Sequence, residues 1–306
     1  MIVVTTPTGN IGRHVVRHLL DAHAALRLIV RDANTLPPAV RERVDIVEGS
    51  HGDATIVDRA LRGADAVFWL CPPTPSATPD AATVDFARPA ADAIRRHGIA
   101  HVVAVTTLGR GTQWQDRAGT VTGSIRMVDL MRQTGASVRG LALPAFMDNA
   151  LRQIEAIRHG KMVGPIDPHR KLPHTATLDS GLAAAGLLLD RSWSGQEDIA
   201  VLGPEELSYS ELAAIVSETI GKPVQYEHQS YEAYKQACIG RGFTEAFAQG
   251  FVDMLRAKEE GMDNAASRDT AIIGRTSFRQ WAEEVLKPAI FDGQKNAGGP
   301  NNRSTG

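Results

Sequence analysis

The sequence predicts an α/β protein in which a doubly wound parallel sheet is followed by a smaller, mainly helical lobe. Two observations carry this prediction. Short runs of apolar, often β-branched residues alternate through the first half of the chain with longer stretches whose apolar residues recur every three or four positions. The short runs are apolar along their whole length, which is typical of parallel strands that helices cover on both faces.

The elements of the first half follow one another in a regular order. Strands are expected at residues 2–4, 26–30, 44–47, 66–70 and 102–105. Helical patterns with one apolar face lie between them, at residues 15–20, 56–61 and 86–94. A helix over residues 125–133 and a strand over residues 138–143 continue the alternation. We expect residues 1–150 to form one doubly wound domain.

The second half is less regular and reads as a separate lobe. Another strand is expected at residues 199–202, and helices at residues 210–220, 231–239, 244–258 and 277–286. We expect residues 151–290 to form a mixed substrate-binding lobe that returns strands to the sheet and packs over the carboxyl ends of the strands. The tail, residues 291–306, is rich in small and polar residues, so it is expected to be disordered.

Composition restricts the classes of function. Of 306 residues, 43% are hydrophobic and 22% charged, and the net charge is −2, which is ordinary for a globular protein. No nucleic-acid or membrane surface is indicated. Cys71 and Cys238 are too few for a disulfide framework. The histidines lack ligand spacing, so no metal site is expected.

The start of the chain favours a cytoplasmic protein. Strand-like sequence begins at Ile2 and a glycine loop follows directly, so we expect no targeting segment. The longest apolar stretch, residues 182–189, is much shorter than the roughly 18 residues that a membrane helix requires. We expect a soluble protein that binds a small molecule, and a homodimer is compatible with the sequence.

A glycine-containing loop joins the first strand to the first helix. Its pattern, Gly9-x-x-Gly12, matches the end of the Rossmann dinucleotide fingerprint, with Thr6 where a first glycine usually stands. Glycines let the backbone approach a pyrophosphate, which the helix N-terminus then stabilises. The alternative is a tight strand-to-helix turn. The loop residues expected to bind the cofactor are Thr6, Thr8, Gly9, Asn10, Ile11 and Gly12.

Arg31 ends the second strand at the position that distinguishes the two nicotinamide cofactors. An acidic residue there would bind a ribose 2′-hydroxyl, whereas an arginine pairs with the 2′-phosphate of NADP. Arg31 precedes Asp32, so NADP(H) is favoured and NAD is the less favoured cofactor. The alternative is an ordinary solvated arginine.

Several motifs together resemble the NmrA-like family of atypical short-chain dehydrogenase/reductase proteins. In chain order they are TGNIGRHVV, LIVRD, GADAVFWLCPP, VTTLG, LALPAFMDNAL, LGPEELSYSELAAIVSETIGKPVQYE and GRTSFRQWAEE. The resemblance covers about residues 1–290 and implies a Rossmann fold. It departs from the family at Thr6, at Ser50-His51 where an acidic residue is usual, and before Pro144, where an arginine is usual.

The resemblance also implies where the nicotinamide would lie. The turns after the fourth and fifth strands would flank its ribose and ring, and the PAFMDN segment would line the nicotinamide and substrate pocket. The residues concerned are Leu70, Cys71, Pro72, Thr106, Thr107 and Phe146.

The usual catalytic pair of short-chain dehydrogenases is missing from the first half. No tyrosine precedes Tyr209 and no lysine precedes Lys161, and Thr120 and Ser124 occupy the expected positions. A literal Tyr-x-x-x-Lys does occur at Tyr231 and Lys235, but in the second lobe, so we interpret it as a chance match.

Other residues are candidates for chemistry. The hydroxyl of Thr107 could polarise a substrate carbonyl, and His174 could act as an acid or base, the alternatives being a turn hydroxyl and a structural histidine. Trp114, Met147 and Asn149 are candidates for the substrate pocket, although aromatic and apolar residues there could equally be core.

Three functions remain open from the sequence. The first is an NADPH-dependent oxidoreductase that transfers hydride to a small planar acceptor, such as a quinone, an imine or a conjugated carbonyl, without the Tyr–Lys pair. The second is an NAD(P)-binding redox sensor or regulator. The third is a non-redox isomerase or cyclase on the same scaffold.

Overall fold

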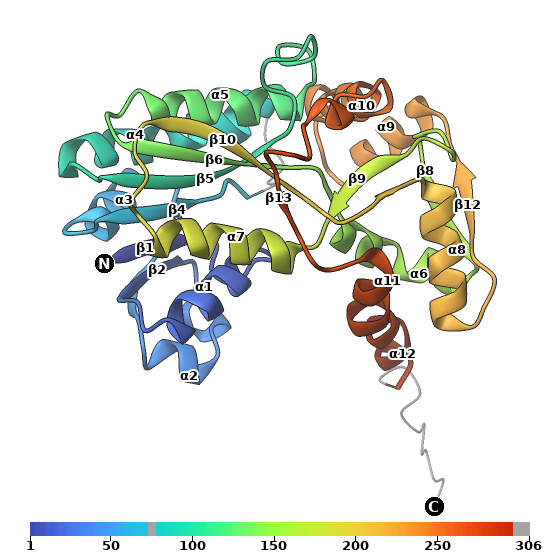
Figure 1. Cartoon of the computed structure of the whole chain (residues 1–306), viewed down its shortest axis with the longest axis horizontal. Coiled ribbons are helices and arrows are strands. Elements are labelled where there is room, and N and C mark those ends of the chain that lie inside the picture. Colours follow the sequence, from blue (N-terminus) through green and yellow to red (C-terminus); the bar gives the residue numbers. More distant parts are fainter. Residues whose placement is uncertain (73–77, 296–306) are drawn as a thin grey trace, which may run out of the picture.

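The structure, a computed structural model, describes residues 1–72 and 78–295, with side chains up to Phe291. Eight parallel strands form one sheet in the order β13-β10-β6-β5-β4-β1-β2-β3 (Figure 1). These strands are β1 (Ile2–Thr5), β2 (Leu26–Val30), β3 (Asp45–Glu48), β4 (Ala66–Trp69), β5 (His101–Thr107), β6 (Ser137–Leu143), β10 (Gln196–Leu202) and β13 (Ile272–Ile273). The predicted doubly wound parallel sheet is therefore confirmed.

Helices cover both faces of the sheet. In Figure 1, α4 (Phe86–His97) and α5 (Thr120–Arg132) lie above it, and α1 (Gly12–Asp21) and α7 (Thr177–Leu189) below it. A further helix, α3 (Ala54–Leu61), packs beside α4 in the upper layer. Short turns η1 (Ala33–Thr35), α2 (Pro38–Arg41) and η2 (Ala81–Asp85) connect these elements. The strands are buried on both faces because each layer supplies apolar side chains to one of two large clusters.

The helix pair α1 and α7 packs very closely. A Cβ atom at Gly181 would lie 2.5 Å from the Cβ of His14, so only glycine fits at that crossing. The apolar positions of α1, Val15 and Leu19, are fully buried beneath the sheet. Helix α7 was not predicted as an element, because its sequence is apolar on nearly every side and shows little periodicity.

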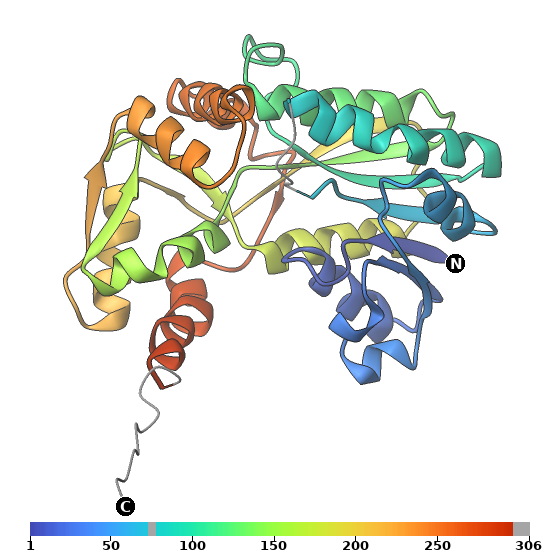
Figure 2. The ribbon, with the colours of Figure 1, turned by 180° about the vertical axis from the view of Figure 1, so that it is seen from behind.

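The second lobe is mainly helical, as expected, and also contains two small sheets. It contains a three-stranded sheet, β11-β9-β7, and a two-stranded parallel sheet, β12-β8. Its elements are β7 (Ala145–Phe146), η3 (Met147–Gln153), α6 (Ile154–Arg158), β8 (Lys161–Gly164), β9 (Leu172–Thr175), β11 (Glu206–Leu207), α8 (Tyr209–Ile220), β12 (Gln225–His228), α9 (Tyr231–Gly240), α10 (Glu245–Glu259) and η4 (Asp263–Ala265). Seen from behind, the lobe lies beside the carboxyl ends of the large sheet (Figure 2).

The end of the chain corrects one expectation. Residues 291–295 were expected to be disordered, but they continue α12 (Lys287–Lys295), which follows α11 (Phe278–Trp281) and η5 (Ala282–Leu286). The buried side chain of Ile290 anchors this helix, and its carbonyl accepts a hydrogen bond from Nη2 of Arg158 at 2.7 Å. Residues 296–306 lie outside the described residues.

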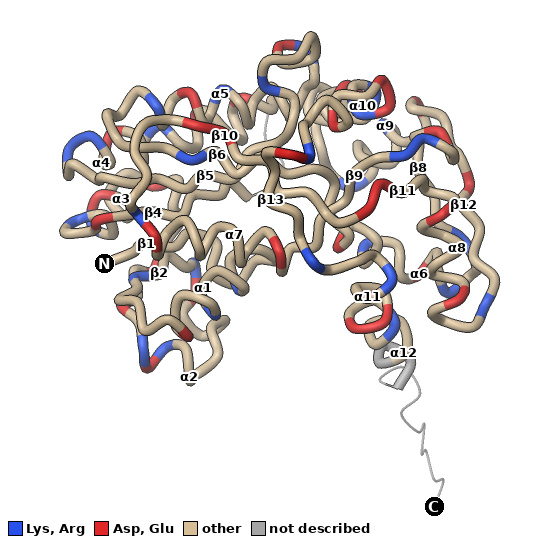
Figure 3. The backbone as a smooth tube through the Cα atoms, in the orientation of Figure 1, with Lys and Arg blue, Asp and Glu red and all other residues tan. Residues whose placement is uncertain are grey.

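Charged residues of both signs alternate over the two lobes (Figure 3). Among the residues that the structure describes, no helix is long and apolar enough to cross a membrane.

Candidate functional site

The loop between β1 and α1 has the backbone geometry of a phosphate-binding turn. A Cβ atom at Gly12 would lie 2.0 Å from the carbonyl oxygen of Thr6, so no other residue fits there without moving the loop. The same carbonyl accepts the N–H of Gly9 at 3.0 Å. Thr6 itself has φ of +48°, in the left-handed region that glycine adopts without strain. This explains why a glycine is usual at position 6.

The loop also offers free hydrogen-bond donors. Within the described part of the chain, no acceptor contacts the N–H groups of Asn10, Ile11 or Gly12, and no side chain caps α1. Unpaired N–H groups at a helix N-terminus bind anions well. The side-chain hydroxyl of Thr6 is likewise buried without a partner. The residues therefore fit the pyrophosphate of a dinucleotide.

Arg13 adds a positive charge that the sequence reasoning missed. It stands in the first turn of α1, where a cation is unfavourable to the helix dipole. Its guanidinium is half exposed and lies 3.9 Å from the buried carboxylate of Asp148. Beside it, burial and then the charge of Arg13 lower the pKa of His14 to about 4, so this histidine is neutral. The unfavourable position of Arg13 in the first turn of the helix was the sequence signal that could have identified it as a candidate phosphate-binding residue.

The side chains of Arg31 and Asp32 differ in their hydrogen bonding. Oδ1 of Asp32 accepts the N–H of Asn34 at 2.8 Å and so caps η1. The exposed guanidinium of Arg31 makes no hydrogen bond or ion pair with any described residue. A free arginine beside an occupied aspartate favours a phosphate ligand over a ribose hydroxyl.

The end of β4 is held by buried side chains. Oγ1 of Thr5 accepts the N–H of Leu70 at 3.0 Å, and Nε2 of His51 lies 3.0 Å from the carbonyl oxygen of Leu70. Burial lowers the pKa of His51 to about 4, so its ring is neutral. Burial raises the pKa of the Cys71 thiol to about 12, so Cys71 is protonated. Pro72 is the last described residue before residues 73–77, which the structure does not describe.

The two threonines that end β5 face opposite sides of the sheet. The buried hydroxyl of Thr106 accepts a hydrogen bond of 3.3 Å from the hydroxyl of Ser124 in α5. The hydroxyl of Thr107 is buried and has no partner among the described residues. Thr107 thus carries a polar group that a ligand could satisfy.

Thr175 carries another unpaired hydroxyl, after those of Thr6 and Thr107, and no motif pointed to it. It lies in β9 opposite Phe146 of β7, and its Oγ1 is buried without a partner in the described chain. Phe146 is partly buried against the same apolar cluster as Leu70 and Val105. The expected position of Phe146 beside the nicotinamide stays a prediction.

The three residues expected in the substrate pocket do not lie together in the structure. Trp114 packs in a small cluster between α5 and α10, and its Nε1 donates to Glu260 at 2.7 Å. Met147 is buried in the core of the second lobe. Asn149 is exposed, and its side chain makes no hydrogen bond with the described residues. For Trp114 and Met147 this geometry favours the core alternative.

His174 belongs to a buried polar cluster in the second lobe. Its Nδ1 donates to the carbonyl oxygen of Leu172 at 3.0 Å, which leaves Nε2 as a bare acceptor, buried and unpaired among the described residues. Burial first, and then the ammonium of Lys258, lower the pKa of His174 to about 4. His174 is therefore neutral near pH 7, which favours a structural histidine over an acid.

Lys258 and Asp263 complete this cluster and were missed from the sequence. Nζ of Lys258 lies 2.5 Å from Oδ2 of Asp263, and the two residues are 5% and 1% exposed. Oδ1 of Asp263 is buried with no partner in the described chain. The ring of Tyr209 packs edge-on against His174 with 5.9 Å between centroids. Lysine and aspartate residues are rarely buried. The sequence alone does not show which lysines and aspartates are buried in the fold.

The Tyr-x-x-x-Lys match does not form a catalytic pair. The hydroxyl of Tyr231 donates to Glu259 at 2.7 Å, and Nζ of Lys235 pairs instead with Glu245 at 3.1 Å. Burial and the Glu259 carboxylate raise the pKa of Tyr231 above its usual value. Both arrangements favour the chance interpretation.

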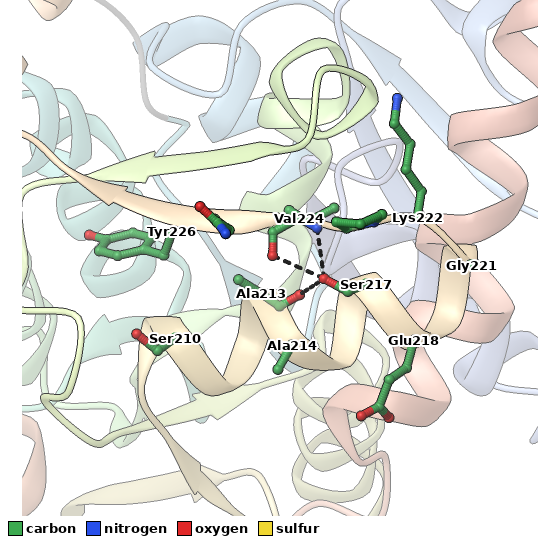
Figure 4. Close-up of a pocket in the computed structure, with 11 residues that line it drawn as sticks. Ser210, Ala213, Ala214, Ser217, Glu218, Gly221, Lys222, Val224 and Tyr226 are labelled. Atoms are coloured by element: carbon green, nitrogen blue, oxygen red, sulfur yellow. Dashed lines mark hydrogen bonds between the residues drawn. The ribbon is translucent and has the colours of Figure 1, made fainter.

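Two surface grooves are apparent, and neither contains the loop residues. One lies between α8 and β12 (Figure 4), where Ser217 already hydrogen-bonds Ala213 and Val224, so its polar groups are satisfied. The other lies between Thr78–Asp80 and the start of α5, where Arg126 pairs with Asp80 at 3.0 Å.

Comparison with known proteins identifies the first half of the chain. Residues 7–139 match the NAD(P)H-binding family model, so this part of the chain is an NAD(P)H-binding domain. The expected nicotinamide cofactor is thereby confirmed.

Individual relatives agree with this class. The chain is 28% identical over 289 residues to a (4-alkanoyl-5-oxo-2,5-dihydrofuran-3-yl)methyl phosphate reductase of Streptomyces griseus subsp. griseus, covering 93% of this chain and 97% of that protein. The fold of this chain is similar to that of Citrobacter sp. triphenylmethane reductase complexed with NADP(H), with a TM-score of 0.77 and 19% identity. The match covers 94% of this chain and 100% of the reductase. The fold is also similar to that of NmrA, a negative transcriptional regulator, in complex with NAD, with a TM-score of 0.67, 19% identity and 98% of each chain covered. The NmrA-like fold indicated by the motifs is confirmed.

Proposed function

We propose that this protein is an NADPH-dependent oxidoreductase that transfers hydride to a small planar acceptor. The observation that carries the proposal is the set of unsatisfied groups along the carboxyl ends of the strands. Free N–H groups at α1, the unpaired guanidinium of Arg31 and the unpaired hydroxyl of Thr107 follow or end β1, β2 and β5, at the edge of the sheet where α/β proteins bind ligands. The reductases among its relatives support a redox reaction.

Different residues of the chain would bind the cofactor and the acceptor. The N–H groups of Asn10, Ile11 and Gly12, with Arg13, bind the pyrophosphate, and Arg31 binds the 2′-phosphate. The bound cofactor supplies the hydride. The hydroxyl of Thr107 hydrogen-bonds the nicotinamide or the acceptor beside it. Residues 1–150 would bind the cofactor and residues 151–290 the acceptor, and holding the two close together provides most of the rate.

A titration of the purified protein with NADPH and with NADH tests the cofactor assignment, followed by NADPH oxidation with menadione as the quinone. Tighter binding of NADPH and steady turnover are expected. Tighter binding of NADH would contradict the role of Arg31, and binding without turnover of any acceptor would contradict the oxidoreductase.

A regulator is the second candidate, because the chain lacks the Tyr–Lys pair and shares its fold with a transcriptional regulator. In that case the protein binds the dinucleotide tightly, does not oxidise it with menadione, and binds a protein partner with an affinity that depends on the bound cofactor.

A further inference from the structure

The buried ion pair Lys258–Asp263 has few hydrogen bonds for its degree of burial. Each residue is less than a tenth exposed, yet only one carboxylate oxygen of Asp263 is paired and the other has no donor among the described residues. The Lys258 ammonium has three N–H groups, and a single hydrogen bond, to Asp263, is observed for it. Burying ions is costly unless their remaining groups are satisfied. The pair therefore presents free donors and a free acceptor at one point.

His174 adds a third unsatisfied group. Because its Nδ1 donates to Leu172, its Nε2 must accept, and Nε2 is buried without a donor in the described part of the chain. The charge of Lys258 acts on His174, and η4, which carries Asp263, packs against β9, which carries His174. Buried acceptors of this kind are satisfied by a polar ligand or by an ordered water.

Two contacts place this cluster next to the expected nicotinamide. A Cβ atom at Gly109, two residues after Thr107, would lie 2.7 Å from the sulfur of Met262, the neighbour of Asp263. His174 pairs with Ala145 in the segment that follows β6. The cluster thus lies between the ends of β5 and β6, on the side of the second lobe. This is where an acceptor would meet the cofactor.

We propose that Lys258 donates the proton to the acceptor oxygen, and that Asp263 positions Lys258, in place of the missing Tyr–Lys pair. This inference rests on the proposed function. The acceptor, a quinone or conjugated carbonyl, gains a hydride from NADPH, which is oxidised to NADP⁺. The π electron pair of its carbonyl moves onto oxygen, which takes a proton from the ammonium of Lys258. The new hydroxyl then has Asp263 Oδ1 or His174 Nε2 to donate to, and the neutral amine regains a proton from water.

The substrate class follows from this chemistry. Acceptors that develop negative charge on oxygen need the donor, whereas a cationic triarylmethane dye accepts hydride at carbon and is neutralised without a proton. Lys258 therefore determines activity with the first class only.

The experiment compares menadione with a cationic triarylmethane dye. The Lys258→Met/Asp263→Asn double variant removes the donor without leaving a buried charge unpaired. Lys258→Arg keeps a charged donor, and Lys235→Met is the matched control, since Lys235 of α9 pairs with Glu245 of α10. NADPH affinity, menadione affinity of the cofactor-free protein, and kcat and KM with each acceptor are measured.

We expect the double variant to bind NADPH as the parent does, to lose about 100-fold or more in kcat with menadione, and to keep dye reduction within a few-fold. Menadione binding to the cofactor-free double variant should weaken about tenfold, the loss of roughly one hydrogen bond to a charged group. Lys258→Arg should restore part of the menadione activity.

Equal activity of the double variant and the parent with menadione would overturn the role of Lys258. Equal losses with both acceptors would also overturn it, since a structural brace would affect both. If the parent itself turns over neither acceptor, the oxidoreductase proposal fails instead.

Discussion

The carboxylate of Asp179 in α7 accepts two hydrogen bonds from Thr276, one from the backbone N–H at 3.0 Å and one from the hydroxyl at 3.1 Å. Both residues are buried. A Cβ atom at Gly274 would lie 2.4 Å from the same carboxylate, so the chain passes directly against it. The contact fastens the segment after β13 to the face of the sheet that α7 covers.

Asp179→Ala should lower the free energy of unfolding by about 3 kcal/mol or more, because two buried hydrogen bonds to a charged group are lost. Urea unfolding measures the change. Thr276→Val, which keeps the backbone bond, should cost roughly half as much. Equal costs for the two variants would contradict this division between the hydroxyl and the backbone.

Arg31→Ala should weaken NADPH binding by about tenfold to a hundredfold, while NADH binding changes little, because only NADPH carries the 2′-phosphate. Fluorescence titration with each cofactor measures both affinities. Arg41→Ala, which removes a neighbouring cation bonded to Asn34, is the matched control. Parallel losses for NADPH and NADH would show that Arg31 does not contact the 2′-phosphate.

The phosphate loop should respond in opposite directions to two substitutions. Gly12→Ala should abolish detectable NADPH binding and lower the Tm, since its Cβ would collide with the Thr6 carbonyl. Thr6→Gly should stabilise the protein by up to about 1 kcal/mol, because a β-branched residue with φ of +48° is strained. The measurements are thermal unfolding and NADPH titration. A Thr6→Gly protein less stable than the parent would show that the threonine is not strained.

Stability should fall in mild acid because of His174. Its pKa is about 4 in the folded protein and near 6.5 when unfolded. As the pH falls, the unfolded chain therefore takes up a proton on this histidine before the folded protein does. The contribution of His174 to the free energy of unfolding is complete above pH 6.5 and is lost as the pH falls toward 4. Between pH 7 and pH 4.5 it amounts to about 2–3 kcal/mol.

Urea unfolding of the parent and of His174→Phe at several pH values checks this effect. The variant should lose less stability over the same interval. His14 and His51 have pKa values lowered to about 4 as well, so the variant retains part of the dependence. Identical pH dependence in both proteins would mean that His174 is not the buried neutral group.

Tyr231→Phe should leave any reductase activity within a few-fold of the parent. Tyr231 donates to Glu259 and its pKa is raised, so it is a poor acid. Thr107→Val, near the expected nicotinamide, should lower kcat by more. A loss of about a hundredfold in Tyr231→Phe, with NADPH affinity unchanged, would place the proton donor in α9 after all.

The sequence was most informative where local pattern and packing agree. Strands such as β4 are buried on both faces, so their unbroken apolar runs were diagnostic. The phosphate loop was recognised from Gly9 and Gly12, because its geometry depends on residues close together in the chain. The positive φ of Thr6 was not foreseen, although the missing glycine pointed to that position.

Contacts between distant residues could not be predicted in this way. Lys258 at the end of α10 and Asp263 in η4 look like ordinary surface residues in the sequence, and the packing of η4 against β9 helps to bury them. Short strands such as β8 and β12 pair with each other across sixty residues, and neither has enough length to show a period. Helix α7 was missed because its apolar residues run almost without a break, so the sequence shows no helical period.

Exchange of whole lobes between related proteins would not preserve this fold. Strand β10 pairs with β6 along five residues, and α7 packs on α1, so two elements from the second half of the chain complete the first domain. A fragment ending at residue 150 would expose the edge of β6 and the apolar face of α1 to solvent, and such surfaces promote aggregation. Functional crossovers between homologues should therefore fall inside the second lobe, where a segment such as α6 to β8 can be replaced without opening the large sheet.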